Sequence, residues 1–111
     1  MKQLLVASGY IAMEDDVADA VLDYERALGE LHRTERVRIP AFINEGDTVC
    51  ELILGCGTVW GTITLPNTDG RRVAGSKDAV RNLRERAEGL RAELSLPFDD
   101  DWYRDVPPEV G

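Results

Sequence analysis

The feature that most constrains the fold is an apolar stripe of helical period in the first third of the chain. Its members recur three or four positions apart: Val17, Ala20, Val21, Tyr24, Leu28 and Leu31. That spacing is typical of a helix that buries one face against another layer. Three carboxylates at 14–16 precede the stripe, where Asp15 or Asp16 can cap the free backbone amides. We therefore expect a helix from these acids to about His32.

Three segments of β-strand character follow: 36–43, 48–54 and 58–65. The turn sequences 44–47 and 55–57 separate them, which favours an antiparallel meander. Pro40 has no backbone N–H, so we expect its strand at an edge. In the last segment Trp60 alternates with Val59 and Ile63, and we expect the side that carries the tryptophan and threonines to be the less buried one.

The two ends of the domain complete the expected architecture. Residues 3–13 surround the turn dipeptide Ser8-Gly9 and form either one kinked strand or a short hairpin, of which we favour the hairpin. Ser76 can cap a second helix. The predicted fold class is α+β: an antiparallel β-meander of three to five strands with two helices on one face, in the order β(β)-α-β-β-β-α. Residues 1–96 form this domain, and 97–111 form an acidic, aromatic tail.

The second helix carries apolar residues at alternating spacings of three and four, which is the seam of a coiled-coil-like contact. This seam can pack on the sheet or the first helix, or it can join two chains in a homodimer. The candidate oligomerisation residues are Val80, Leu83, Leu90 and Leu94.

Charge limits the classes of partner. The chain of 111 residues has a net charge of −8, with seven acids in 14–30 against Arg26 alone. Direct nucleic-acid binding is not expected, because phosphate contact needs a concentrated basic surface. No apolar run reaches the length of a membrane span, and the N-terminus falls short of a secretion signal, so we expect a cytoplasmic protein. Its excess of arginine over lysine is typical of a high-GC bacterium or its phage.

Candidate chemical motifs all favour structural interpretations. The sequence 54–61 resembles the glycine-rich loop of protein kinases, but its third glycine falls one residue late, so we interpret it as a tight β-turn. His32 lacks a nucleophile at a telling spacing and suits a helix C-terminus. Cys50 and Cys56 are expected as reduced thiols, since a zinc site would need further ligands. We predict no catalytic residue, metal or cofactor.

The acidic tail is the main candidate for binding a partner. Aromatic side chains supply contact area, and carboxylates steer toward a basic surface. The candidate partner-binding residues are Phe98, Asp99, Asp100, Asp101, Trp102, Tyr103 and Asp105, together with Trp60. The alternative is that the tail aromatics pack back onto the sheet. The consecutive aspartates lack the spacing of a calcium loop.

These observations favour a small, non-catalytic interaction module: a regulator, adaptor or inhibitor that binds a basic surface of another protein. Three alternatives remain open. The chain can mimic nucleic acid as an inhibitor of bacterial or phage origin, act as a small ligand-binding domain or enzyme with its site on the sheet face, or serve as a self-assembling structural subunit.

Overall fold

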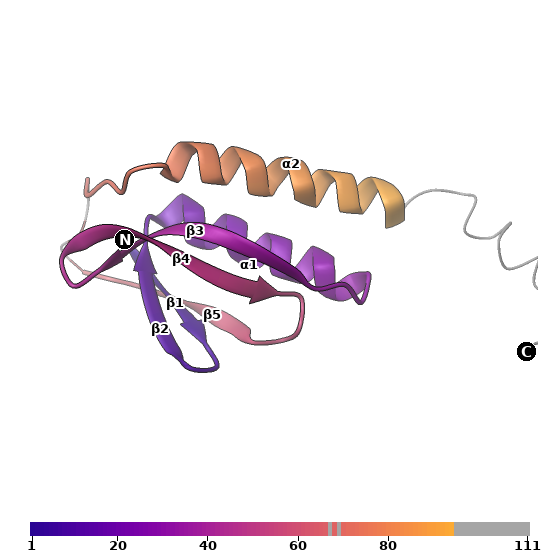
Figure 1. Cartoon of the computed structure of the whole chain (residues 1–111), viewed down its shortest axis with the longest axis horizontal. Coiled ribbons are helices and arrows are strands. Elements are labelled where there is room, and N and C mark those ends of the chain that lie inside the picture. The colour runs from indigo at the N-terminus through magenta and orange to yellow at the C-terminus, as the bar shows by residue number, and fades with distance from the viewer. Residues whose placement is uncertain (67, 69, 95–111) are drawn as a thin grey trace, which may run out of the picture.

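The computed structural model describes residues 1–66, 68 and 70–94. Its elements, in chain order, are β1 (Lys2–Val6), β2 (Gly9–Met13), α1 (Asp15–Glu30), β3 (Glu35–Ile43), β4 (Gly46–Leu54), β5 (Val59–Thr64) and α2 (Ser76–Leu94). Five antiparallel strands form one sheet, and the helices lie on one side of it (Figure 1). The predicted α+β class and order of elements are confirmed, as is the hairpin around Ser8-Gly9.

The strands lie in the order β4-β3-β2-β1-β5. A simple meander would place β5 beside β4, but β5 pairs with β1 instead. Backbone hydrogen bonds hold both ends of this pairing, from Ala7 N–H to the Thr58 carbonyl at 2.8 Å and from Leu65 N–H to the Met1 carbonyl at 2.9 Å. The last strand therefore crosses from one edge of the sheet to the other.

Pro40 lies in an interior strand, yet it behaves as an edge residue. β2 pairs with β3 only between Ala12 and Phe42, so the earlier part of β3 has no strand on that side. α2 lies beside this part of β3 and contacts it. The missing N–H of Pro40 therefore costs the sheet no hydrogen bond.

The core lies between the sheet and α1. The predicted stripe is buried from Val17 to Leu28, and its largest member, Tyr24, is 1% exposed; Leu31, just after α1, is partly buried. Leu4, Met13, Ile39 and Leu54 from four strands complete this layer as fully buried side chains. α2 packs mainly on α1, so the helices form successive layers over one face of the sheet (Figure 1).

Both helix boundaries differ from the expected caps. Glu14, not Asp15 or Asp16, is the N-cap residue of α1, and its side chain makes no capping bond. α2 begins at Ser76; the carbonyl of the preceding Gly75 accepts Ala79 N–H, while the Ser76 hydroxyl donates to the Val73 carbonyl. Glu14 instead accepts the N–H of Val73, and Ser76 bonds to the loop before α2, so neither side chain caps its helix.

Candidate functional site

Over β1, β2 and β5 the sheet face opposite the helices has no charged side chain, whereas over β3 and β4 it carries Arg36, Arg38, Asp47 and Glu51. Arg71 lies over the Phe42 ring of this face, 4.9 Å from its centre. One row of side chains crosses all five strands, in the order Ile63, Gln3, Ala12, Phe42 and Asp47. In the next row Leu5 lies opposite Tyr10, whose side chain is 68% exposed. We call this surface the open face; it also includes Val49 and Ile53 of β4, which are about half exposed.

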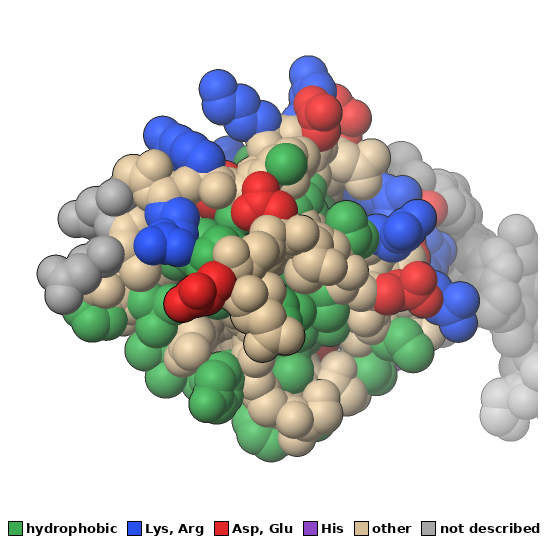
Figure 2. Space-filling model, turned by 60° about the vertical axis from the view of Figure 1, so that its left-hand side comes forward, with side chains coloured by type: hydrophobic (Ala, Val, Ile, Leu, Met, Phe, Trp, Pro, Cys, Tyr) green, Lys and Arg blue, Asp and Glu red, His purple; other side chains and the backbone are tan. Residues whose placement is uncertain are grey.

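The space-filling view shows the same division of the surface. Blue and red side chains gather in the upper part of Figure 2, whereas the lower part, over the strands, is mainly green and tan. Exposed apolar side chains that lie side by side are typical of protein-binding surfaces. Sequence reasoning missed this face, because each strand alone shows only two or three of its residues. One signal for this face was present in β2: Tyr10 points to the side of the sheet opposite to half-buried Ile11 and buried Met13.

Trp60, a predicted partner-binding residue, is 67% exposed at the edge of this sheet. The register of β5 against β1 shifts here: Val59 lies opposite Val6 and Gly61 opposite Leu5, so Trp60 is the extra residue of a β-bulge. A bulge turns a side chain out of the regular alternation. Trp60 accordingly lines a surface hollow with Leu22 and Arg26 of α1.

The same bulge makes one expectation wrong. Thr62 lies opposite fully buried Leu4 and is itself half-buried, so the threonines of β5 face the helix side. Ile63 lies on the open face and is half exposed. After Trp60, each β5 side chain points to the face opposite to the predicted one. The reason is that side chains alternate between faces, so one inserted residue moves all later ones to the other face.

The glycine-rich loop between β4 and β5 binds a carboxylate of the protein itself. Glu25 of α1 accepts the N–H of Gly55 through Oε2 and the N–H of Gly57 through Oε1, the latter at 3.1 Å. Both glycines have positive φ, at 95° and 79°. Amides arranged in this way would face a phosphate in a nucleotide-binding loop. Here they are occupied by Glu25, which supports the interpretation as a structural turn.

Most acids of α1 are likewise engaged within the chain. Asp15 contacts the N-terminal amine, Asp19 pairs with Lys2, and Asp23 pairs with Arg91. The hydrogen bond to Asp19 raises the pKa of the Lys2 amine. These carboxylates therefore hold α1 to the N-terminal segment, to β1 and to α2.

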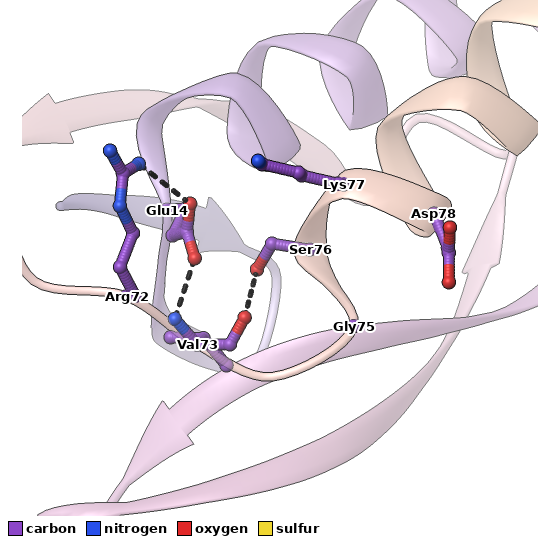
Figure 3. A pocket seen from close by; sticks show the side chains of 7 residues that line it. All are labelled: Glu14, Arg72, Val73, Gly75, Ser76, Lys77 and Asp78. Atoms are coloured by element: carbon purple, nitrogen blue, oxygen red, sulfur yellow. Dashed lines mark hydrogen bonds and ion pairs between the residues drawn. The ribbon is translucent and has the colours of Figure 1, made fainter.

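A hollow of about 470 Å³ lies at the start of α2 (Figure 3). Glu14 forms one wall, where it accepts Val73 N–H at 2.5 Å and pairs with Arg72 at 3.5 Å. Lys77 and Asp78 extend from the helix start. Acids and bases alternate around this hollow, so its charge favours neither an anion nor a cation.

The predicted oligomerisation seam lies against α1. Leu83 and Leu90 belong to the core, Val80 packs against it, and Leu94 is 39% exposed. The two central leucines are thus already used within one chain, as in the helix-packing alternative. Self-association through this seam stays a prediction, since the structure contains one chain.

The remaining chemical candidates are separated from one another. His32 is exposed beyond the end of α1, and Cys56 is exposed in the β4–β5 loop. Cys50 lies on β4, where burial raises the pKa of its thiol. Within residues 1–66, 68 and 70–94, no three His, Cys, Asp or Glu side chains are grouped to hold a metal ion.

One polar cluster lies at the junction of three elements, with Tyr24 buried and the Glu35 and Arg86 side chains 37% and 43% exposed. The Tyr24 hydroxyl donates to Glu35 at the start of β3, and Arg86 of α2 pairs with the other carboxylate oxygen. Burial, followed by the hydrogen bond to Glu35, raises the pKa of Tyr24 to about 12. A tyrosine held in its neutral form and bonded in this way connects the layers of the fold.

Residues Phe98, Asp99, Asp100, Asp101, Trp102, Tyr103 and Asp105 lie outside the described residues. Neither described helix has the length and apolar character needed to cross a membrane. Comparison with known protein families, curated proteins and solved structures finds no match to this chain.

Proposed function

We propose that the protein is a non-catalytic interaction module that binds another protein through the open face of its sheet. The observation that carries this proposal is the group of exposed apolar side chains on that face, led by Tyr10 and Ile63, which are 68% and 49% exposed. Removing such a surface from water on binding is favourable in proportion to its apolar area. Tyrosine is typical of the interface residues that dominate binding energy.

The proposed partner has an apolar patch beside a basic surface. Charge complementarity supports this choice, because the whole chain carries −8 and five of its acids follow residue 97. The ion pair of Arg33 with Glu93, at 2.7 Å, holds the end of α2 beside the start of β3. The acidic residues that come after α2 in the sequence are proposed to add steering toward a basic partner.

A comparative capture experiment tests this proposal. The tagged full chain, a Tyr10→Ser/Ile63→Ser variant and a Lys77→Ser/Arg81→Ser control are used as baits in extract of the source organism. Circular dichroism first checks that all three are folded. Each protein captured by the wild type is then purified, and its affinity for all three baits is measured by calorimetry at low and high salt.

We expect the control to bind the purified partner like the wild type, and the open-face variant to bind at least about tenfold more weakly. Affinity should fall as salt rises, since the partner is basic. Equal binding by the open-face variant would overturn the proposal. A further variant, Phe98→Ser/Trp102→Ser/Tyr103→Ser, separates the predicted contribution of the C-terminal aromatics from that of the sheet.

We also propose a cytoplasmic location. Both cysteines are free, and reduced thiols are typical of cytosolic proteins. Thiol labelling in intact and lysed cells tests this: a membrane-impermeant maleimide should label exposed Cys56 only after lysis.

A further inference from the structure

The two edge strands of the sheet are protected to different degrees. β5 has six residues and is interrupted by the bulge at Trp60. β4 has nine residues, contains no proline, and pairs with β3 in an unbroken register from Gly46 to Leu54. Bulges, prolines and short length are the usual means by which an edge strand avoids pairing with another chain. β4 has none of these; its charged side chains, Asp47 and Glu51, restrict instead the registers in which it can pair.

The turn before β4 shows which of its backbone groups face outward. Asn44 and Glu45, with φ of 53° and 61°, form the two-residue loop of a type I′ hairpin, so the flanking pair Ile43 and Gly46 is a hydrogen-bonded one. Bonded pairs alternate along an antiparallel ladder. The N–H and C=O groups of Asp47, Val49, Glu51 and Ile53 therefore point away from β3.

Local contacts limit this free edge at one end. The Ile53 carbonyl accepts the Thr58 hydroxyl at 3.3 Å and the Cys56 thiol at 3.7 Å, which agrees with its outward direction. The outward groups of Val49 and Glu51, in the middle of the strand, have no strand beside them within the described part of the chain.

We propose that β4 pairs with β4 of a second copy of this chain, antiparallel across a two-fold axis, to form a continuous ten-stranded sheet. A closed two-fold dimer is the commonest way in which a surface binds itself. Charge selects the register. With Cys50 opposite Cys50 of the second copy, Val49 lies opposite Glu51, and no like charges face each other.

Neighbouring registers are disfavoured by repulsion. A shift of the pairing in one direction places Asp47 opposite Glu51, and a shift in the other places Glu51 opposite Glu51. Like charges directly opposite each other destabilise an antiparallel pair. In the register centred on Cys50, four backbone hydrogen bonds join Val49 and Glu51 of the two copies. The open face then continues across both chains.

This arrangement places the two Cys50 residues in a non-hydrogen-bonded pair, with Cα atoms about 4.5 Å apart. That separation lies within the range that a disulfide spans. Oxidation by diamide, which takes two electrons and two protons from the thiols, should therefore join two Cys56→Ser chains through Cys50. The resulting covalent dimer reports the register directly.

The test uses the full chain, reduced, over a concentration series in analytical ultracentrifugation. We expect twice the chain mass of 12.3 kDa. Val49→Pro should give a single-chain mass, because it removes an outward N–H that β3 does not use, whereas the matched control Val49→Thr should remain a dimer. Circular dichroism checks that both variants keep the wild-type fold.

A single-chain mass for the wild type would overturn the proposal. So would a dimer that Val49→Pro leaves intact, or one in which diamide gives no Cys50 cross-link. A wild-type monomer that dimerises only when Phe98, Trp102 and Tyr103 are replaced by serine would show that the chain's own C-terminal segment occupies the edge, which also overturns it. Because these measurements need no partner protein, their failure is distinct from failure of the proposed function.

Discussion

The hydroxyl of Tyr24, buried in the middle of α1, donates a hydrogen bond to the carboxylate of Glu35 at the first residue of β3. Arg86 of α2 holds the same carboxylate from the other side. This cluster therefore fixes both helices to the sheet near the end of α1. It also gives the protein a stability that depends on pH.

Tyr24→Phe should lower the free energy of unfolding by about 1–2 kcal/mol at neutral pH, because it removes a hydrogen bond to a charged group. Urea denaturation followed by circular dichroism measures this. The matched control is Tyr10→Phe, which removes the hydroxyl of a largely exposed tyrosine and should change the stability by less than about 0.5 kcal/mol. Equal effects of the two substitutions would contradict the role of the cluster.

The pH dependence of the wild type follows from the same contact. Folding raises the Tyr24 pKa from 10.0 to about 12, so the folded state holds this proton more tightly than the unfolded state. This contribution to the free energy of unfolding, on the order of 2 kcal/mol, is complete below pH 10 and is lost as pH rises through 12. The Tyr24→Phe variant should lack this part of the alkaline loss. Parallel curves for the two proteins between pH 9 and about 12 would contradict the assignment.

Glu25→Ala should loosen the β4–β5 loop, because it removes the acceptor for Gly55 and Gly57. We expect a loss of about 1–2 kcal/mol in stability, since each bond is charge-assisted and partly exposed. Hydrogen exchange at these two amides should become faster in the variant, while exchange in the middle of α1 stays slow. Glu30→Ala, on the same helix, is the control and should leave loop exchange unchanged.

Local patterns were sufficient to predict the helices and strands. The period of Val17, Tyr24 and Leu28 predicted α1, and the turn at Ser8-Gly9 predicted the first hairpin. The predicted meander paired β3 with β4 correctly but placed β5 beside β4, because alternation along β5 contains no information on whether it pairs with β4 or β1. The bulge at Trp60 was equally hidden, since a bulge appears only when two strands are aligned.

The candidate site shows the same limit. Charge counting found the acids of α1 but not their partners: Asp19 pairs with Lys2, and Asp23 pairs with Arg91. The open face was missed for the opposite reason. Leu5, Tyr10 and Ile63 come from three strands and form one surface only after the sheet is assembled.

Gly55→Ala should be among the most damaging substitutions in the described chain. A Cβ atom there would lie 2.0 Å from the Arg33 carbonyl oxygen, at a φ of +95° that L-residues rarely adopt. We expect a loss of more than about 3 kcal/mol in stability or failure to fold. Gly57→Ala is the matched control: φ is +79° but no atom lies within 4 Å, so the loss should be about 1–2 kcal/mol. Thermal unfolding of both variants measures whether the close contact with the Arg33 carbonyl destabilises the protein beyond the strain of a positive φ.

His32→Gly should stabilise the protein. His32 follows the end of α1 with a φ of 54°; its N–H bonds to the Gly29 carbonyl, and the next N–H, of Arg33, bonds to the Leu28 carbonyl. This is the Schellman arrangement, in which glycine is the preferred residue, because a left-handed conformation costs other residues about 1–2 kcal/mol.

Urea denaturation should therefore show a gain of about 1 kcal/mol for His32→Gly and none for His32→Ala, which removes the imidazole but keeps the strain. If both variants were destabilised equally, the imidazole itself would be supporting the helix C-terminus, as the sequence first suggested. The comparison thus separates a backbone role at this position from a charge role, because alanine and glycine differ here only in the Cβ atom.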